Sequence, residues 1–377
     1  MKAFVVVCSV ILLVFSACGP QADGDAALTI AVIAPFSGDF ESLGHATRDG
    51  VVLAIEEWNQ RGGVLGKSVQ ATLLDSQCDY ETAREVTQAG INDQGVQFIV
   101  GAVCSDAAEG VAQIATQLGV VQISSTSVDP ELTLDFDGKV RPLVFRAPFI
   151  DPLQGTVAAK FALETFQVDS AAILYAENSE YGLALADAFE ETFKAGDGEI
   201  LIRATYDQDA QLYYDVLETV RDANPGILYM PGYYNVMDRL VTQARTFGLL
   251  QTIIGSDGWD SPDLNLPVVD GSYFTTHYFP GEPRPEVAAW IQRYRSRYLV
   301  PPNAVATLGY DATNILLTAI QEAGTTAPYQ VAAAMETLTF ETISGQMTFD
   351  EVHNPIKSVL IVRVLNGQMV YIDRLTP

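Results

Sequence analysis

The sequence predicts an α/β protein built from two Rossmann-like lobes, each with a parallel central sheet. The chain has 377 residues, which is more than one hydrophobic core usually fills. Short apolar strands alternate with amphipathic helices, which is typical of parallel βαβ units. The alternation restarts after the stretch "FRAPFIDP" at 145–152, so the pattern occurs twice. These observations together favour two similar α/β lobes.

The first half contains a regular series of apolar strands and amphipathic helices. Its strands are expected at 28–36, 68–75, 96–102 and 120–125, and its helices at 44–63, 80–93 and 106–119. The first strand, "LTIAVIAPF", is apolar throughout, which indicates a strand buried on both faces.

The second half repeats this series and then departs from it. Its strands are expected at 170–176, 199–206, 226–232 and 251–257, and its helices near 153–166, from Tyr181, near 212–223 and near 236–247. The remaining tail predicts helices at 286–299 and 305–324 and strands at 357–365 and 369–375. These last elements must add to one or both lobes.

Composition and charge limit the possible partners. Apolar residues make up 48% of the chain and charged residues 18%, as in a compact globular protein. The formal net charge of -26 argues against nucleic acid as a partner, because neutralising phosphates requires clustered Lys and Arg. The acidic balance indicates a well-solvated surface and does not identify a ligand.

The N-terminus predicts export from the cytoplasm. Lys2 precedes an apolar run at 3–15, and small residues at 16–17 lead to Cys18. We interpret 1–18 as a signal peptide, because the run is too short to span a membrane. Its end resembles a bacterial lipobox, although Phe15 replaces the usual aliphatic residue, so an ordinary cleaved signal is the alternative. The resemblance implies lipidation of Cys18, a tether at 19–27 and a membrane-anchored protein in the periplasm or another extracytoplasmic space.

The cysteines fit an oxidising compartment. Cys8 leaves with the signal peptide and Cys18 would carry the lipid, so Cys78 and Cys104 remain. Two remaining cysteines in such a compartment are expected to form a disulfide. Closing a loop of this length would stabilise the fold by about 3.5 kcal/mol in the chain-entropy model.

The stretch "NQRGGVLGKS" at 59–68 resembles a phosphate-binding loop but does not match one. The motif G-x-x-x-x-G-K-[ST] requires a glycine at position 61, which is Arg61. The stretch also follows a helix and leads into a strand, which is the reverse of the required order. We expect Gly62 or Gly63 to end the helix and Gly66 to turn the chain into the strand.

No pattern in the sequence indicates an enzyme. There is no G-x-S-x-G, and no G-x-G-x-x-G follows the first strand. The three histidines, His45, His277 and His353, accompany no evident nucleophile and do not stand at metal-ligand spacing. We therefore expect neither a metal site nor a cofactor.

Several motifs resemble those of one protein family. "IAVIAPFSGDFESLG" and "GVVLAIEEWNQRGGVLGKSV" are similar to the opening of type I periplasmic solute-binding proteins, nearest to the Leu/Ile/Val-binding proteins of branched-chain amino-acid ABC transporters. "DSQCDYETA", "IVGAVCS", "ISSTSVDPELT", "ENSEYGLALAD", "MPGYYNVMDRLVTQARTFGL", "IGSDGW" and "LGYDATNILLTAI" follow in the order found in the family. The resemblance extends from about Leu28 to the C-terminus.

The resemblance implies lobes built from separated segments and joined by a three-segment hinge. Its crossings would lie near 146–148, 275–278 and 353–355. The first lobe would then contain 26–146 plus 277–354, and the second 147–276 plus 355–377. The early disulfide of the family also falls on Cys78 and Cys104.

The resemblance implies that residues of the first lobe bind the ligand carboxylate. Ser105 follows a strand and opens a helix, where a hydroxyl and a helix N-terminus can bind an anion. Ser105 could instead only cap the helix. The loop at 124–130 would supply the second contact, but Val128 stands where the family has threonine. Thr126 or Ser127 could replace that hydroxyl, or the ligand could be held differently.

In the second lobe, the resemblance assigns Tyr181, Tyr233 and Asp257 to the ligand. Asp257 would pair with an ammonium group, where the branched-chain binders usually carry glutamate. Aspartate is one methylene shorter, so the lobes must close further or a water must bridge. The alternatives are a turn residue for Asp257 and core packing for the two tyrosines.

The resemblance also implies the mode of action. Leu43, Val103 and Cys104 would form an apolar pocket wall, which favours an apolar amino acid over one with a second carboxylate. The lobes would close about the hinge on the ligand, and the closed form would engage the permease and ATPase subunits of an ABC importer. We expect a monomer. A ligand-sensing ectodomain or regulator is the alternative function, and amides, urea and aromatic acids are alternative ligands.

Overall fold

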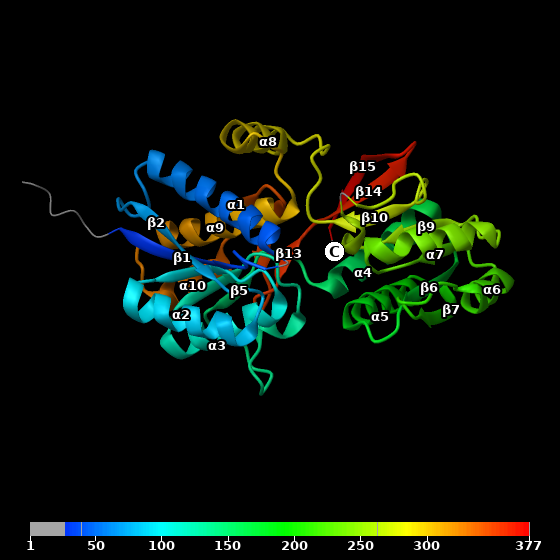
Figure 1. Cartoon of the computed structure of the whole chain (residues 1–377), viewed down its shortest axis with the longest axis horizontal. Helices are drawn as coiled ribbons and strands as arrows, with labels where there is room; N and C mark the ends of the chain where they lie inside the picture. Colours follow the sequence, from blue (N-terminus) through cyan, green and yellow to red (C-terminus); the bar gives the residue numbers. More distant parts are fainter. Residues whose placement is uncertain (1–26, 39, 262, 377) are drawn as a thin grey trace, which may run out of the picture.

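The computed structural model describes residues 27–38, 40–261 and 263–376. The proposed signal peptide and its Cys18 lie outside these residues, as does most of the tether. Figure 1 shows two α/β bodies side by side, joined by a few extended segments near β10, β13 and β14. No helix of the described residues is long and apolar enough to cross a membrane.

The first body contains a parallel sheet of five strands in the order β2-β1-β3-β4-β5. The strands are β1 (Leu28–Ala34), β2 (Val69–Asp75), β3 (Phe98–Gly101), β4 (Val121–Ser124) and β5 (Val144–Arg146). The helices beside them are α1 (Glu41–Gln60), α2 (Tyr80–Gln94), α3 (Ser105–Leu118), α8 (Pro285–Tyr298), α9 (Ala304–Ala323) and α10 (Pro328–Thr337).

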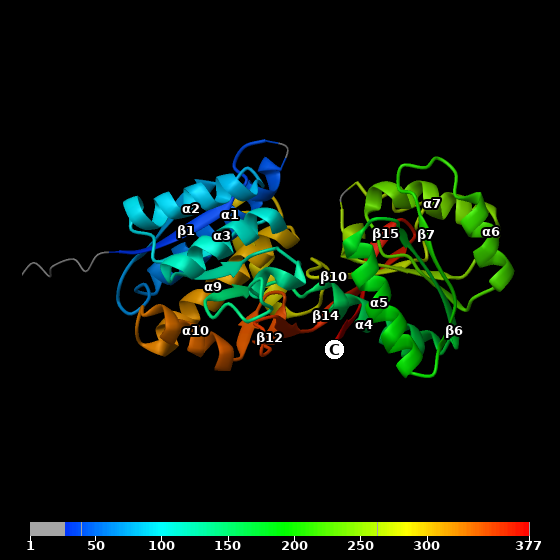
Figure 2. The same cartoon turned by 90° about the horizontal axis from the view of Figure 1, so that it is seen from below.

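Strand β1 is buried on both faces, as its continuous apolar sequence predicts. Ile30 and Val32 join a core with α1, α9 and α10, whereas Ala31 and Ile33 join a second core with α2 and α3. Alternate residues of the strand therefore contact opposite helical layers. Figure 2 shows these two layers on either side of the sheet.

The second body contains a mixed sheet in the order β15-β14-β10-β9-β8-β6-β7. Its strands are β6 (Ser170–Ala176), β7 (Glu199–Tyr206), β8 (Ile227–Tyr229), β9 (Thr252–Gly255), β10 (Tyr273–Thr276), β14 (Val359–Leu365) and β15 (Gln368–Leu375). The helices α4 (Asp151–Phe161) and α5 (Glu180–Ala195) pack on one face, and α6 (Tyr214–Ala223) and α7 (Tyr234–Thr246) on the other. The prediction of two α/β lobes is confirmed, with the addition that β14 and β15 run antiparallel to their neighbours.

Several elements had no counterpart among the expected ones. A small antiparallel sheet consists of β11 (Phe340–Thr342), β12 (Gly345–Phe349) and β13 (Pro355–Lys357). Helix α10 and strand β5 were also missed, as were the short turns η1 (Pro130–Thr133) and η3 (Asp257–Trp259). The helix expected at 153–166 begins earlier, as α4, and its last residues form the π-turn η2 (Ala162–Phe166).

The glycines at 62–66 form a turn between α1 and β2, as predicted. Gly62, Gly63 and Gly66 all have positive φ, and Val64 pairs with Lys67 across the turn. A Cβ atom on Gly63 would lie 1.8 Å from the Lys67 carbonyl oxygen, so the tight turn requires glycine there.

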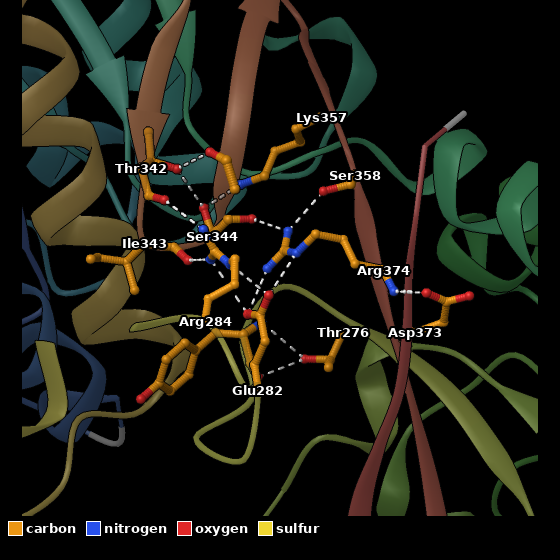
Figure 3. Close-up of polar contacts among 12 residues, drawn as sticks. Thr276, Glu282, Arg284, Thr342, Ile343, Ser344, Lys357, Ser358, Asp373 and Arg374 are labelled. Atoms are coloured by element: carbon orange, nitrogen blue, oxygen red, sulfur yellow. Dashed lines mark hydrogen bonds and ion pairs between the residues drawn. The ribbon is translucent and has the colours of Figure 1, made fainter. Parts of the chain in front are cut away.

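Near the crossings between the bodies, two half-buried arginines surround a buried glutamate (Figure 3). The Glu282 side chain is only 1% exposed and accepts hydrogen bonds from Arg284 and Arg374. Arg374 lies on β15 of the second sheet, and it also donates to the Ser344 carbonyl and to the Ser358 hydroxyl. This ionic cluster, Glu282–Arg284–Arg374, therefore links the last strand of the second sheet to the small sheet.

Candidate functional site

Ser105 lies at the N-terminus of α3, just past the carboxyl end of β3. The preceding Cys104 has an extended backbone and its side chain forms no capping hydrogen bond. The first N–H groups of a helix have no intrahelical acceptors, and the helix dipole adds partial positive charge there. Ser105 is half-buried, and its hydroxyl belongs to the first residue of this helix, beside the free N–H groups. The arrangement suits a carboxylate.

The loop after β4 brings a second hydroxyl to Ser105. Ser127 donates a hydrogen bond to the Ser105 hydroxyl over 3.2 Å, whereas the Thr126 hydroxyl donates to the Val103 carbonyl over 2.8 Å. Val128 is half-buried and has no hydroxyl to offer. Of the two candidates to replace the threonine of the resembled family, Ser127 is thus the one beside Ser105. In addition, the buried Ser125 hydroxyl has no partner among the described residues.

A disulfide fixes the turn that carries Ser105. Cys78 and Cys104 are bonded, with a Cα–Cα distance of 5.3 Å, so the predicted disulfide is confirmed. It ties the segment after β2 to the residue before α3. Of the expected pocket wall, Val103 is 7% exposed, while Cys104 and Leu43 in the first turn of α1 are half-buried.

Asp257 follows β9 in the second body and is held by three side chains. The Tyr181 hydroxyl donates to its Oδ1 over 2.7 Å, and Gln154 Nε2 donates to the same oxygen over 2.8 Å. His277 Nε2 lies 3.2 Å from Oδ2. The Asp257 N–H in turn donates to Gln154 Oε1 over 3.1 Å. This set fixes the direction of the carboxylate.

Asp257 is ionised despite its burial. Burial alone would raise the pKa of this carboxyl, but the hydrogen bond and the electrostatic attraction of His277, together with hydrogen bonds from Tyr181 and Gln154, outweigh it and lower the pKa below the usual value. Burial lowers the pKa of His277, so its imidazole is neutral and its Nε2–H donates to Asp257. The Asp257 side chain remains 20% exposed, which leaves its charge accessible to a ligand.

Tyr181 and Tyr233 stack on each other beside Asp257, with ring centroids 4.9 Å apart. The Tyr181 hydroxyl also accepts from the Gly258 N–H over 3.1 Å, and burial together with the Asp257 charge raises its pKa, so it stays protonated. Tyr233 is 51% exposed. Its ring therefore presents an accessible aromatic face next to the carboxylate.

The structure brings the predicted residues together as two groups. Ser105 contacts Ser127 in the first body, and Tyr181 contacts Asp257 and Tyr233 in the second. Within the described part of the chain, no hydrogen bond joins one group to the other. A cavity of about 550 Å³ lies elsewhere, beside the ionic cluster, and none of these residues lines it.

Sequence reasoning missed Gln154 and the role of His277. Gln154 lies on α4 and His277 follows β10, more than 100 residues apart in the chain, and both contact Asp257. His277 is buried and stacks on Phe149, with ring centroids 3.7 Å apart. No local sequence signal distinguishes such residues, because their partners come from distant segments.

The chemistry of the two groups is complementary to a zwitterion. One group offers hydroxyl and N–H donors, and the other offers an ionised carboxylate flanked by phenol rings. Ser105 contacts another hydroxyl rather than a base, so no activated nucleophile is present at this position. The arrangement suits the binding of such a molecule.

The chain is similar to known proteins of one family. The family described as periplasmic binding protein matches residues 27–368. A leucine-, isoleucine-, valine-, threonine- and alanine-binding protein of Pseudomonas aeruginosa is 28% identical over 326 residues, which is 86% of this chain and 86% of that protein. A leucine-binding protein structure from Thermotoga maritima is 29% identical, with a TM-score of 0.74 over 93% of this chain and 99% of that one.

A second solved structure carries a bound amino acid. It is a branched-chain amino acid transporter substrate-binding protein from Streptococcus pneumoniae in complex with isoleucine. It is 25% identical, with a TM-score of 0.75 over 93% of this chain and all of that one.

Proposed function

Because the chain belongs to the periplasmic binding protein family, a family of binding proteins and not enzymes, we propose that it is the solute-binding protein of an ABC importer. We propose that it binds an amino acid between the Ser105 and Asp257 groups. The relatives named for leucine and other apolar amino acids support this class of ligand. The permease, the ATPase and the lipid anchor at Cys18 belong to the same proposal.

The single observation that carries the ligand class is the ionised Asp257 carboxylate. A buried anion is costly unless a cation pairs with it. Two of its three protein partners, Tyr181 and Gln154, are neutral hydrogen-bond donors, and burial lowers the pKa of the third, His277, so little positive charge within the group offsets the carboxylate at neutral pH. A ligand with an ammonium group would supply the missing charge. An aromatic or aliphatic acid without an ammonium group would instead place a second anion in the same site.

Lobe closure would complete the site. Ser105, Ser127 and the α3 N-terminus would hold the ligand carboxylate, and rotation about the crossings would bring Asp257, Tyr181 and Tyr233 onto the ligand. Leu43 and the exposed face of Tyr233 favour an apolar side chain.

A pair of ligands that differ only in the ammonium group tests this proposal. We expect L-leucine to bind the processed protein and 4-methylpentanoate, its deaminated analogue, to bind at least tenfold more weakly, as measured by isothermal titration calorimetry. Asp257→Asn should weaken leucine binding by about 1.5–3 kcal/mol, the usual value of a hydrogen bond to a charged group. The control is Glu180→Gln, an exposed carboxylate at the start of α5. Equal affinity for both ligands, or unchanged affinity in Asp257→Asn, would contradict the amino-acid assignment.

A further inference from the structure

The cavity beside the ionic cluster has no part in the candidate site. Its volume of about 550 Å³ is in the usual range of small-molecule pockets. Met347 on β12 lines it and belongs to the core of the first body, whereas Arg374 on β15 lines it from the second sheet. The cavity therefore lies where the two bodies meet.

Three cations line this cavity, although acidic residues outnumber basic ones in the chain by 47 to 21. They are Arg284, Lys357 and Arg374. Glu341 is the one carboxylate among the described residues that line the cavity, and it is exposed and accepts a hydrogen bond from Gln346. The lining thus has an excess of positive charge, which is the opposite of the chain as a whole.

The two guanidinium groups of the ionic cluster are not fully used by the protein. Each has five N–H donors. Arg374 makes four hydrogen bonds, to Glu282, the Ser344 carbonyl and the Ser358 hydroxyl. Arg284 also makes four, to Glu282 and to two backbone carbonyls. One N–H group of each arginine therefore has no acceptor among the described residues.

The arginines also remain accessible and carry unbalanced charge. Their side chains are 27% exposed for Arg284 and 15% exposed for Arg374. Figure 3 shows both guanidinium groups on the single carboxylate of Glu282. Two cations that share one anion leave one positive charge in excess.

Lys357 adds a second positive charge without a counter-ion. The residue is only 2% exposed, and its ammonium group donates to the Ala147 carbonyl over 3.3 Å and to the Ser344 hydroxyl over 2.6 Å. Within the described part of the chain it forms no ion pair. The nearby carboxylate of Asp311 accepts instead from the backbone N–H groups of Ile343 and Ser344. A buried ammonium group without an anion is costly, so the lining favours an anionic ligand.

The ammonium group of Lys357 keeps its charge at neutral pH. Burial lowers the pKa of Lys357 to about 8, with Asp311 opposing this and the charges of Arg374 and Arg284 adding to it. An amine with a pKa of about 8 is about nine-tenths protonated at pH 7. The excess of positive charge is therefore present under ordinary conditions.

The unused groups suit a phosphate better than a carboxylate. A carboxylate is bound best by two parallel N–H groups of one arginine, and Glu282 already occupies those groups. Single N–H donors remain, together with the hydroxyls of Thr348 and Thr376 in the lining. These donors come from separate segments, and a phosphate offers three acceptor oxygens that point in different directions. Met347 and Ile356 add apolar surface beside them.

We propose that this cavity is a second binding site, and that its ligand is a small organic phosphate monoester. The phosphate would accept hydrogen bonds from the free N–H groups of Arg284 and Arg374 and offset the charge of Lys357. The organic part would lie against Met347 and Ile356. Because the lining comes from both bodies, the bound ligand would connect them. The cavity shares no residue with the Ser105 and Asp257 groups, so this site does not depend on the proposed function.

Three small anions test the class of ligand by isothermal titration calorimetry in a buffer without phosphate. We expect phenyl phosphate to bind the processed protein, and inorganic phosphate to bind more weakly because it has no apolar part. Benzoate, which replaces the phosphate with a carboxylate, should bind at least about tenfold more weakly than phenyl phosphate, the loss expected for one hydrogen bond to a charged group. No binding of phenyl phosphate, or equal binding of benzoate, would overturn the proposal.

Variants of the lining test the location of the site. Arg374→Gln and Lys357→Met each remove a cation, and each should weaken phenyl phosphate binding by at least about tenfold. Gln346→Glu adds a negative charge at an exposed lining position, so it should weaken binding without a change in the urea midpoint. This variant separates loss of affinity from loss of folding. The control is Arg221→Gln, an exposed arginine on α6 outside the lining, which should bind as the wild type does.

Ser105→Ala separates this cavity from the candidate site, because the N-terminus of α3 also suits an anion. We expect Ser105→Ala to bind phenyl phosphate as the wild type does. If it loses binding while Arg374→Gln and Gln346→Glu keep it, phenyl phosphate occupies the candidate site and the second site is refuted. Unchanged affinity in all three lining variants would refute it as well. Failure of leucine to bind would contradict the proposed function and leave this second site unaffected.

Discussion

Two carboxylates in the same neighbourhood have opposite protonation states because their partners differ. Asp257 accepts hydrogen bonds from Tyr181, Gln154 and His277, and these lower its pKa in spite of burial. Burial, together with the charge of Asp257, raises the pKa of Asp151, the first residue of α4, to about 8, and its Oδ1 has no hydrogen-bond partner among the described residues. At neutral pH one carboxyl is thus ionised and the other mostly protonated.

The raised pKa of Asp151 also predicts how stability depends on pH. Because the folded state holds this proton more tightly than the unfolded state does, Asp151 contributes stability below its unfolded pKa of about 4. That contribution is lost as the pH rises from about 4 to 8. Asp151→Asn should therefore raise the free energy of unfolding relative to wild type at pH 8, with little difference at pH 4. Urea denaturation of both proteins at the two pH values measures this, and a benefit larger at pH 4 would contradict it.

At the scale of elements, two loops bring the second group together by close backbone contact. A Cβ atom on Gly258 would lie 2.5 Å from the Gly232 carbonyl oxygen, so the loop after β9 lies directly against the loop after β8. These loops carry Asp257 and Tyr233. The contact sets the distance between the carboxylate and the exposed phenol ring.

Gly258→Ala should separate these loops. The added methyl group meets backbone atoms that cannot rotate away, so we expect a loss of about 1–3 kcal/mol in stability, as for overpacked sites. Leucine affinity should fall as well, because Asp257 and Tyr233 move apart. Gly248→Ala is not a suitable control, because Gly248 has positive φ. Ala223→Gly at the end of α6 tests whether a small change elsewhere in the second body has the same effect. Unchanged ligand affinity in Gly258→Ala would show that the contact does not position the site.

The elements that could be predicted from the sequence are those with strong local patterns. The apolar run of β1 and the glycine turn after α1 follow from residue type and spacing, and both are confirmed. The strands β11–β13 were missed because they are short and gain their order from pairing with one another. Gln154 and Asp151 were missed for a different reason. Their importance depends on Asp257, which lies about 100 residues further along the chain.

At the scale of the whole molecule, the ionic cluster joins the two bodies, and the charge of each member stabilises the opposite charge of its neighbours. Burial would raise the pKa of Glu282, but Arg374 and Arg284 outweigh this and lower it. Glu282 is the shared acceptor of both guanidinium groups. Removal of the Glu282 carboxylate leaves two neighbouring guanidinium groups without their shared anion. Removal of the Arg374 guanidinium group leaves Glu282 still paired with Arg284. The two removals should therefore lower the stability of the protein by unequal amounts.

We expect Glu282→Gln to destabilise the protein by about 3–5 kcal/mol, the usual cost of breaking a buried ion pair from one side. Arg374→Gln should cost less, and the double variant should cost less than the sum of the two, because the second change removes a cation that the first left without a partner. Glu218→Gln, in an exposed pair with Arg221, should change stability by no more than about 1 kcal/mol. Urea denaturation measures all four variants.

Because Arg374 belongs to the second sheet and the small sheet packs with the first core, Glu282→Gln should also divide a single unfolding transition into two. If the losses of stability add and the protein still unfolds in a single transition, the two bodies are coupled through contacts other than this ionic cluster.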